Sequence, residues 1–158
     1  MNLASLTRAA TALSLLAIPS FAQDFSDPAL IEEGEAQFRK CRACHMVGED
    51  AQKRSGPALN GMVGGPVAAS EAFADSPGYS PGMLAFAEEN PVWTPDLLNA
   101  YLEKPRDLVE GTKMVFVGLR EQEERDAMIA YLASFSPDFV PEASGEAGAE
   151  TPEEEPAE

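Results

Sequence analysis

Apolar residues recur along this chain at the spacing of short helices, and no stretch of useful length alternates as a strand would. The first helical pattern follows Asp27-Pro28, a residue pair that caps and starts a helix. Because glycine is a poor helix former, we expect another helix to approach closely at Gly34. The apolar face of this first helix runs through Ile31, Gly34, Phe38 and Cys41.

Three more helices are predicted further along the chain. One covers about 83–89 after Ser80-Pro81, and another follows Thr94-Pro95 and stops at Pro105. The last covers about 122–135 and has Met128, Ile129, Tyr131 and Leu132 on its buried side. The pattern therefore predicts an all-α domain.

The two ends of the chain differ in composition from this domain. Residues 1–22 have an early positive charge, a short apolar run and small residues at a cleavage site, which is typical of a secretory signal peptide. The apolar run is too short to span a bilayer comfortably, which disfavours an uncleaved anchor. Residues 137–158 have almost no apolar bulk, so we expect a disordered acidic tail there, and a folded domain over 23–136.

The charge is strongly negative and unevenly distributed. The chain carries 11 basic and 27 acidic residues, a formal charge of −16, which argues against nucleic acid as a partner. From Arg39 to Arg120 there are 9 basic and 10 acidic residues, whereas from Glu121 to the end there is 1 basic residue against 12 acidic ones. We therefore expect a marked charge asymmetry over the molecule.

The strongest chemical signal is the stretch Cys41-Arg42-Ala43-Cys44-His45. It has the spacing C-x-x-C-H, the signature of covalent c-type haem attachment, in which both thiols add to the porphyrin and the histidine binds the iron. A zinc site normally needs four protein ligands, and this sequence has only two cysteines and one histidine. A redox dithiol expects a βαβ context and does not need the histidine.

The second axial position decides what such a haem would do. An open position would bind small gases or activate peroxide, whereas a second strong ligand makes an electron carrier. There is no second histidine in the sequence, so bis-histidine ligation is excluded, but a methionine thioether can serve. Met46 adjoins His45 and cannot reach the opposite ring face, and Met128 lies on a helical stripe that should pack as core. Met62 and Met83 remain candidates, and spacing gives Met114, in a glycine-bounded loop, only a small advantage.

At this point the sequence resembles a class I cytochrome c of the soluble bacterial periplasmic type related to mitochondrial cytochrome c. The resemblance covers about residues 27–135 and follows the family order. It rests on Gly34 and Phe38, the haem motif, Gly56-Pro57-Ala58-Leu59, Trp93, Tyr101-Leu102-Glu103-Lys104-Pro105, Gly111-Thr112-Lys113-Met114, Phe116, Arg125 and Ile129-Ala130-Tyr131-Leu132.

The resemblance implies about four to five short helices wrapped around one haem c, bound covalently through Cys41 and Cys44. It implies that His45 and Met114 are the iron ligands, and that the Pro57 carbonyl holds the imidazole. The remaining implied roles are Trp93 and Thr112 near propionates, Tyr101 near the Met114 sulfur, and Phe116 at the haem edge. The sequence departs from the family at Gly65-Pro66, where an arginine is common, and at Tyr79-Ser80-Pro81, where a Tyr-Thr pair often binds the outer propionate.

The expected function is one-electron transfer in the periplasm, without enzymatic activity, by a monomer. Expected partners are membrane redox complexes: a bc1-type complex, a terminal oxidase or a photosynthetic reaction centre. The alternatives are a dedicated acceptor of one dehydrogenase, or a haem sensor or peroxidase with a displaceable methionine. We expect an apolar haem pocket made of Leu59, Trp93, Leu102, Phe116, Met128 and Leu132. A basic rim is expected from Lys40, Arg42, Lys53, Arg54, Lys104, Arg106, Lys113 and Arg120.

Overall fold

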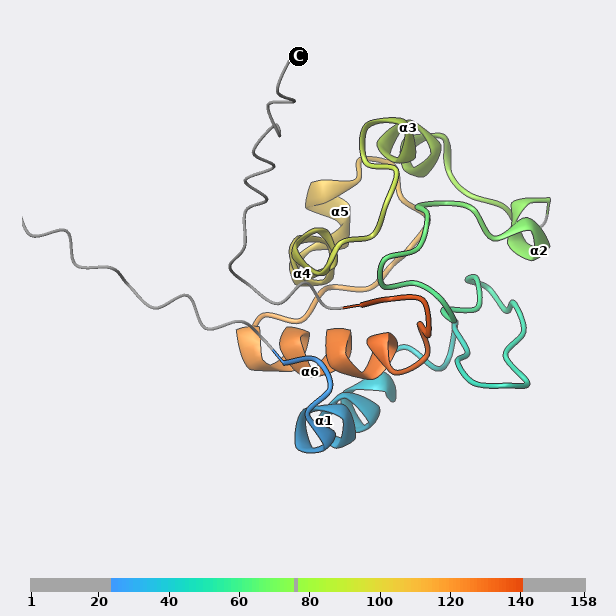
Figure 1. Ribbon diagram of the computed structural model, residues 1–158. Coiled ribbons are helices and arrows are strands. Elements are labelled where there is room, and N and C mark those ends of the chain that lie inside the picture. The colour runs from blue at the N-terminus through green and yellow to red at the C-terminus, as the bar shows by residue number, and fades with distance from the viewer. Residues whose placement is uncertain (1–23, 76, 141–158) are drawn as a thin grey trace, which may run out of the picture. The chain divides into compact units, whose positions relative to one another are not determined.

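The computed structural model describes residues 24–75 and 77–140, which fall within one compact unit of the chain (Figure 1). Within these residues the chain forms six helices and no strand, which confirms the predicted all-α class. An isolated backbone bridge between Pro66 and Val92 is the one β-type pairing in this part of the chain. The helices are α1 (Pro28–Phe38), α2 (Glu71–Ala74), α3 (Pro81–Glu89), α4 (Pro95–Glu103), α5 (Pro105–Leu108) and α6 (Gln122–Ala133).

Three helices begin at a side-chain cap followed by proline, as the sequence predicts. Asp27 accepts a hydrogen bond from the Ala29 N–H, 2.9 Å away, at the start of α1. Ser80 and Thr94 cap α3 and α4 in the same way, each accepting from the N–H three residues on at 3.1 Å. These contacts satisfy amide donors that the first turn of a helix leaves without a partner.

The crossing of α1 and α6 is the main helix–helix contact and lies below the rest of the fold in Figure 1. A Cβ atom added at Gly34 would lie 2.0 Å from the Ala127 carbonyl oxygen, so only glycine allows this separation. Phe38 and Tyr131 also pack across the crossing, with ring centroids 5.3 Å apart. The close approach predicted at Gly34 is therefore confirmed.

The two single-turn helices, α2 and α5, were not predicted. Pro105, which was expected only to end the preceding helix, also begins α5, since proline is tolerated in a first turn. Beyond α6, the buried Ser136 accepts a hydrogen bond from the Val63 N–H at 3.1 Å, and Phe139 packs over Gly64. Packing against the domain therefore continues past residue 136, as far as Phe139.

The predicted signal peptide, 1–22, lies outside the described residues, as does most of the predicted tail, 141–158. Among the helices of the described part, none has the length and apolar character needed to cross a membrane.

Candidate haem site

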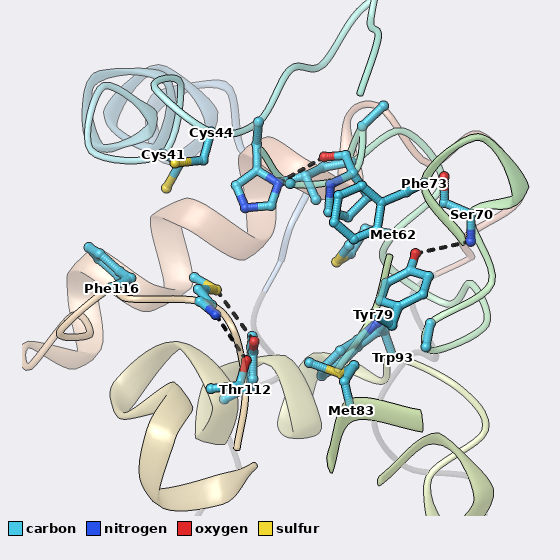
Figure 2. Close-up of a pocket in the computed structure, with 18 of the residues that line it drawn as sticks. Cys41, Cys44, Met62, Ser70, Phe73, Tyr79, Met83, Trp93, Thr112 and Phe116 are labelled. Carbon is cyan, nitrogen blue, oxygen red and sulfur yellow. Dashed lines mark hydrogen bonds between the residues drawn. The ribbon is translucent and has the colours of Figure 1, made fainter. Parts of the chain in front are cut away.

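A cavity of about 790 Å³ opens between α3, α4, α6 and the loops that connect them. Figure 2 shows Cys41 and Cys44 on one side of it and Tyr79 with Ser70 on the other. Its walls are mainly apolar, so burying an unpaired charge inside it costs free energy. All six side chains expected to form an apolar pocket line the cavity: Leu59, Trp93, Leu102, Phe116, Met128 and Leu132.

The two cysteines follow α1 directly and are presented by a single turn. The N–H groups of Cys44 and His45 both donate to the Cys41 carbonyl at 3.0 Å, which keeps the five-residue motif helical in shape. Both thiols are free, half-buried and line the cavity. Burial raises the pKa of the Cys41 thiol to about 11, against the opposing effect of the Lys40 charge, so the thiol is neutral at pH 7.

The imidazole of His45 lines the cavity and is held from behind. Its Nδ1 lies 2.8 Å from the Pro57 carbonyl oxygen, which accepts a hydrogen bond when Nδ1 carries the proton. Burial lowers the pKa of the imidazole, so the neutral form is favoured, with Nε2 left as a lone-pair donor. A Cβ at Gly56 would lie only 2.3 Å from His45 Cε1, so the backbone needs glycine there to seat the ring.

Met114 reaches the cavity from the loop between α5 and α6. The Tyr101 hydroxyl donates a hydrogen bond to Met114 Sδ at 3.3 Å, and the Met114 N–H donates to Thr112 Oγ1 at 3.2 Å. Burial raises the pKa of the Tyr101 phenol, with a hydrogen bond from Thr112 acting in the opposite direction. The sulfur is therefore the one methionine sulfur with a described hydrogen-bond donor in this cavity.

Three other methionines also line the cavity, namely Met62, Met83 and Met128, whereas Met46 does not. Met128 is 1% exposed within the α6 core, as expected from its helical position. Figure 2 places Met62 and Met83 toward the side of Tyr79 and Trp93, away from the cysteines. The structure thus brings three accessible thioethers to one cavity and holds only that of Met114 through a tyrosine.

The wall opposite the cysteines includes Tyr79 and Ser80, where the sequence departs from the pattern of the resemblance. Trp93 is 4% exposed and its ring packs against that of Tyr101, with centroids 5.0 Å apart. The Tyr79 hydroxyl accepts a hydrogen bond from the Ser70 N–H at 3.1 Å, which leaves its own proton available to an anion in the cavity (Figure 2). Ser80 is buried and also lines the wall, whereas none of the arginines in the described part of the chain does.

The expected basic rim is only partly free to act as a surface charge. Lys40 forms an ion pair with Glu124 at 2.7 Å, and Lys104 pairs with Asp107. Lys113 Nζ donates to the carbonyls of residues 77 and 78, at 3.0 and 2.9 Å. These three lysines retain their charge, but each is held by a partner in the same chain.

These residues fit a haem c. Two neighbouring thiols, a neutral imidazole braced through its second nitrogen and an apolar cavity match the donor set and the surroundings that such a group needs. The room that Gly56 leaves for the imidazole supports the same assignment. Sequence reasoning missed the roles of Gly56 and Arg125, and it missed the contact of Lys113 with residues 77–79. Gly56 and Arg125 both belong to the motifs of the family resemblance, but the resemblance assigned them no such role.

Known proteins with similar sequences are cytochromes c. The chain is 40% identical over 113 residues to cytochrome c2 of Afifella marina, which covers 72% of this chain and 88% of that protein. It is 39% identical over 108 residues to cytochrome c-550 of Nitrobacter winogradskyi, covering 68% of this chain and 93% of that protein. No family model matches the sequence.

The fold gives the same result. The structure of cytochrome c2 from Rhodospirillum centenum matches with a TM-score of 0.60 and 38% sequence identity, and covers 68% of this chain and 98% of that one. A small helical fold around a cavity that presents C-x-x-C-H defines the class I cytochromes c. The chain belongs to this family, that of bacterial cytochromes c2 and c-550, whose members are electron-transfer proteins rather than enzymes.

Proposed function

We propose that this chain is a periplasmic one-electron carrier with a single haem c, bound through Cys41 and Cys44 and ligated by His45 and Met114. One observation carries the proposal: His45 and Met114 line the same cavity, and each is oriented by its own hydrogen bond. A haem bound there supplies a one-electron iron couple. The protein supplies ligands that do not need to move when the electron arrives.

The surroundings of the cavity favour the reduced form. The Met114 thioether is a weak donor to iron(III), and apolar walls such as Leu98 and Leu102 disfavour additional positive charge inside. Both effects raise the reduction potential. Among its described lining residues the cavity contains no second imidazole and no carboxylate, the groups that most often perform acid–base chemistry on peroxide.

Electron exchange would take place where Phe116 and its neighbours reach the cavity mouth. Val115 and Val117 are 72% and 85% exposed and also line the cavity, which gives a partner an apolar contact close to the haem. Membrane complexes of the bc1, terminal oxidase or reaction-centre kind are the proposed partners. Export by the signal peptide 1–22 would place the protein with them in the periplasm.

The test is the absorption spectrum of the exported, matured protein, oxidised and reduced, with and without carbon monoxide. We expect a low-spin spectrum with the long-wavelength methionine–iron band and no uptake of carbon monoxide. The band should be lost in Met114→Leu and kept in Met62→Leu and Met83→Leu, which remove the other accessible thioethers. High-spin iron that binds carbon monoxide would overturn the carrier function and favour a sensor or peroxidase.

A further inference from the structure

Arg125 is a buried cation without an acidic partner. Its side chain is 6% exposed, and neither ion pair among the described residues includes it. The guanidinium instead donates to four neutral oxygens. Nη1 bonds the carbonyls of Leu119 at 2.8 Å and Arg120 at 2.7 Å, Nε bonds Asn99 Oδ1 at 2.7 Å, and Nη2 bonds Gln122 Oε1 at 2.6 Å.

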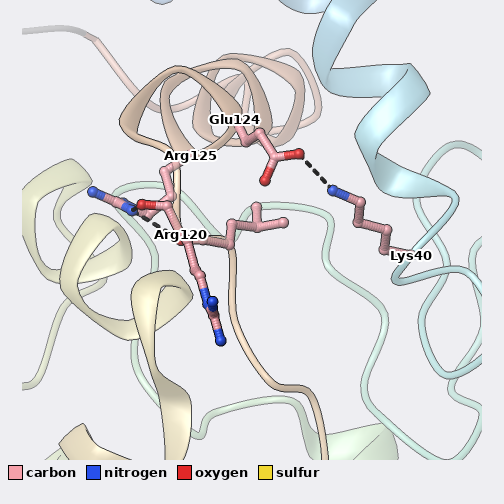
Figure 3. A network of polar contacts seen from close by, with 5 residues as sticks. Lys40, Arg120, Glu124 and Arg125 are labelled. Carbon is pink, nitrogen blue, oxygen red and sulfur yellow. Dashed lines mark hydrogen bonds and ion pairs between the residues drawn. The ribbon is translucent and has the colours of Figure 1, made fainter.

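Such an arrangement is costly unless every donor is satisfied, since burial removes the hydration of the charge. The planar fork of arginine can meet carbonyls in several directions at once, which a lysine ammonium cannot do from the same place. Figure 3 shows Arg125 on the first turns of α6, with Arg120 just below it. The oxygens it binds therefore show what this charge holds together.

Two of these oxygens belong to the end of the loop that carries Met114. Leu119 is 1% exposed, and its N–H donates to the Leu102 carbonyl at 2.8 Å, so this end of the loop is also tied to α4. Asn99 lies in α4 two residues before Tyr101, the donor to Met114 Sδ. The guanidinium thus joins the end of the ligand loop to the helix that orients the ligand.

We propose that Arg125 is a positioning residue for Met114, fixing the end of the loop so that the sulfur stays in the cavity. This inference rests on the proposed role of Met114 as iron ligand. Leu119 lies only five positions after Met114, so a free loop end would let the sulfur leave far more often. Losing bonds from a charged donor to two carbonyls should raise the population of the detached loop by about tenfold or more.

The neighbouring residue provides a natural comparison. Glu124 pairs with Lys40, directly before Cys41, and the two side chains are 27% and 43% exposed (Figure 3). An exposed ion pair contributes little to stability and is screened by salt. The contacts of Arg125 are buried, so salt screens them much less. We therefore expect the effect of Arg125 to be the same at low and high ionic strength.

The experiment measures imidazole binding to the oxidised, haem-loaded protein, because imidazole enters only when the methionine leaves. We expect Arg125→Leu to bind imidazole about tenfold faster and to weaken the methionine–iron band at 25 °C. Arg125→Lys should recover part of this difference through the Leu119 or Arg120 carbonyl. Hydrogen exchange of amides in 111–120 should rise in parallel, a readout that does not depend on the iron.

The control is Ile129→Ala, which damages the core of the same helix at a residue 1% exposed but leaves the loop contacts intact. Equal acceleration in this control, or none in Arg125→Leu and Arg125→Lys, would overturn the positioning role. A wild-type protein without the methionine–iron band would instead refute Met114 as ligand. In that case unchanged exchange in 111–120 of Arg125→Leu would separately refute the anchoring of the loop.

Discussion

The hydroxyl of Tyr101 donates a hydrogen bond to the sulfur of Met114 over 3.3 Å. Tyr101 is a buried residue of α4, so the helix fixes the position of its hydroxyl in the cavity wall. The bond uses a sulfur lone pair and draws electron density away from it. As the proposed iron ligand, Met114 would therefore be a weaker donor toward iron(III) than a methionine in a purely apolar wall.

Removing this hydroxyl should lower the reduction potential. In Tyr101→Phe the sulfur regains electron density and stabilises iron(III), so the midpoint potential should fall by up to about 60 mV, since a hydrogen bond contributes roughly 0.5–1.5 kcal/mol. The potential is measured by redox titration of the Soret band. The methionine–iron band should remain, because Met114 is still in place.

Tyr131→Phe is the matched control for this change. Tyr131 lies outside the cavity lining, between Phe38 and Phe135, with ring centroids 5.3 and 5.1 Å away. Its potential should stay within a few millivolts of wild type. A higher potential in Tyr101→Phe, or the same fall in both variants, would show that the sulfur hydrogen bond does not tune the iron.

A methyl group at Gly56 should displace the imidazole of His45. The added Cβ would lie 2.3 Å from the ring, and the resulting strain should lower the unfolding free energy by about 1–3 kcal/mol and perturb the low-spin spectrum. Gly61→Ala is the comparison, because its φ of +68° strains a side chain while no atom lies within 4 Å. It should cost about 1 kcal/mol and leave the spectrum unchanged. Guanidinium unfolding and absorption spectra test both variants.

Lys113 should stabilise the fold more than a typical surface lysine does. Its ammonium bridges the ligand loop to the carbonyls of residues 77 and 78, whereas Lys104 pairs only with Asp107 in an exposed position. Lys113→Ala should lower the unfolding free energy by about 1 kcal/mol, and Lys104→Ala by less than about 0.5 kcal/mol. Both variants lose one positive charge, so equal losses in denaturant unfolding would mean that the bridge adds no stability.

Much of the fold could be predicted because its signals are local. A cap and a proline mark the starts of α1, α3 and α4, and each cap contact spans only two or three residues. The helices α2 and α5 have four residues each, too few to display a periodic apolar face. The crossing at Gly34 was predictable because glycine disfavours a helix, so its presence within a helical pattern indicates close approach of another helix.

The candidate site likewise has features that follow from local sequence and features that depend on contacts between distant residues. The motif from Cys41 to His45 lies within one turn, so spacing alone predicts how its side chains group together. Spacing alone gave Met114 only a small advantage over Met62 and Met83, since all three are apolar and all reach the cavity, and it was the family resemblance that singled out Met114. The contacts of Arg125 with Asn99, 26 residues away, depend on how helices pack, and no local pattern in the sequence encodes them.

The expected basic rim and the proposed apolar contact are two separate contributions to docking. Arg42 is exposed within the haem motif, and Val117 is 85% exposed beside Phe116. Charges act over a Debye length and guide approach, whereas apolar contact acts only after the partners meet. The two contributions should therefore respond differently to ionic strength.

Reduction by a purified bc1-type complex separates them. In the wild type the second-order rate constant should fall as salt rises from low to high ionic strength, because opposite charges on the two proteins are screened. Arg42→Gln should lower the rate by about twofold at low salt and flatten the salt dependence, since it removes one guiding charge. Val117→Ser should slow transfer at every salt concentration and leave the slope intact, because it removes only contact area. A wild-type rate that does not change with salt would rule out electrostatic steering, and a Val117→Ser rate equal to wild type would place the docking contact elsewhere.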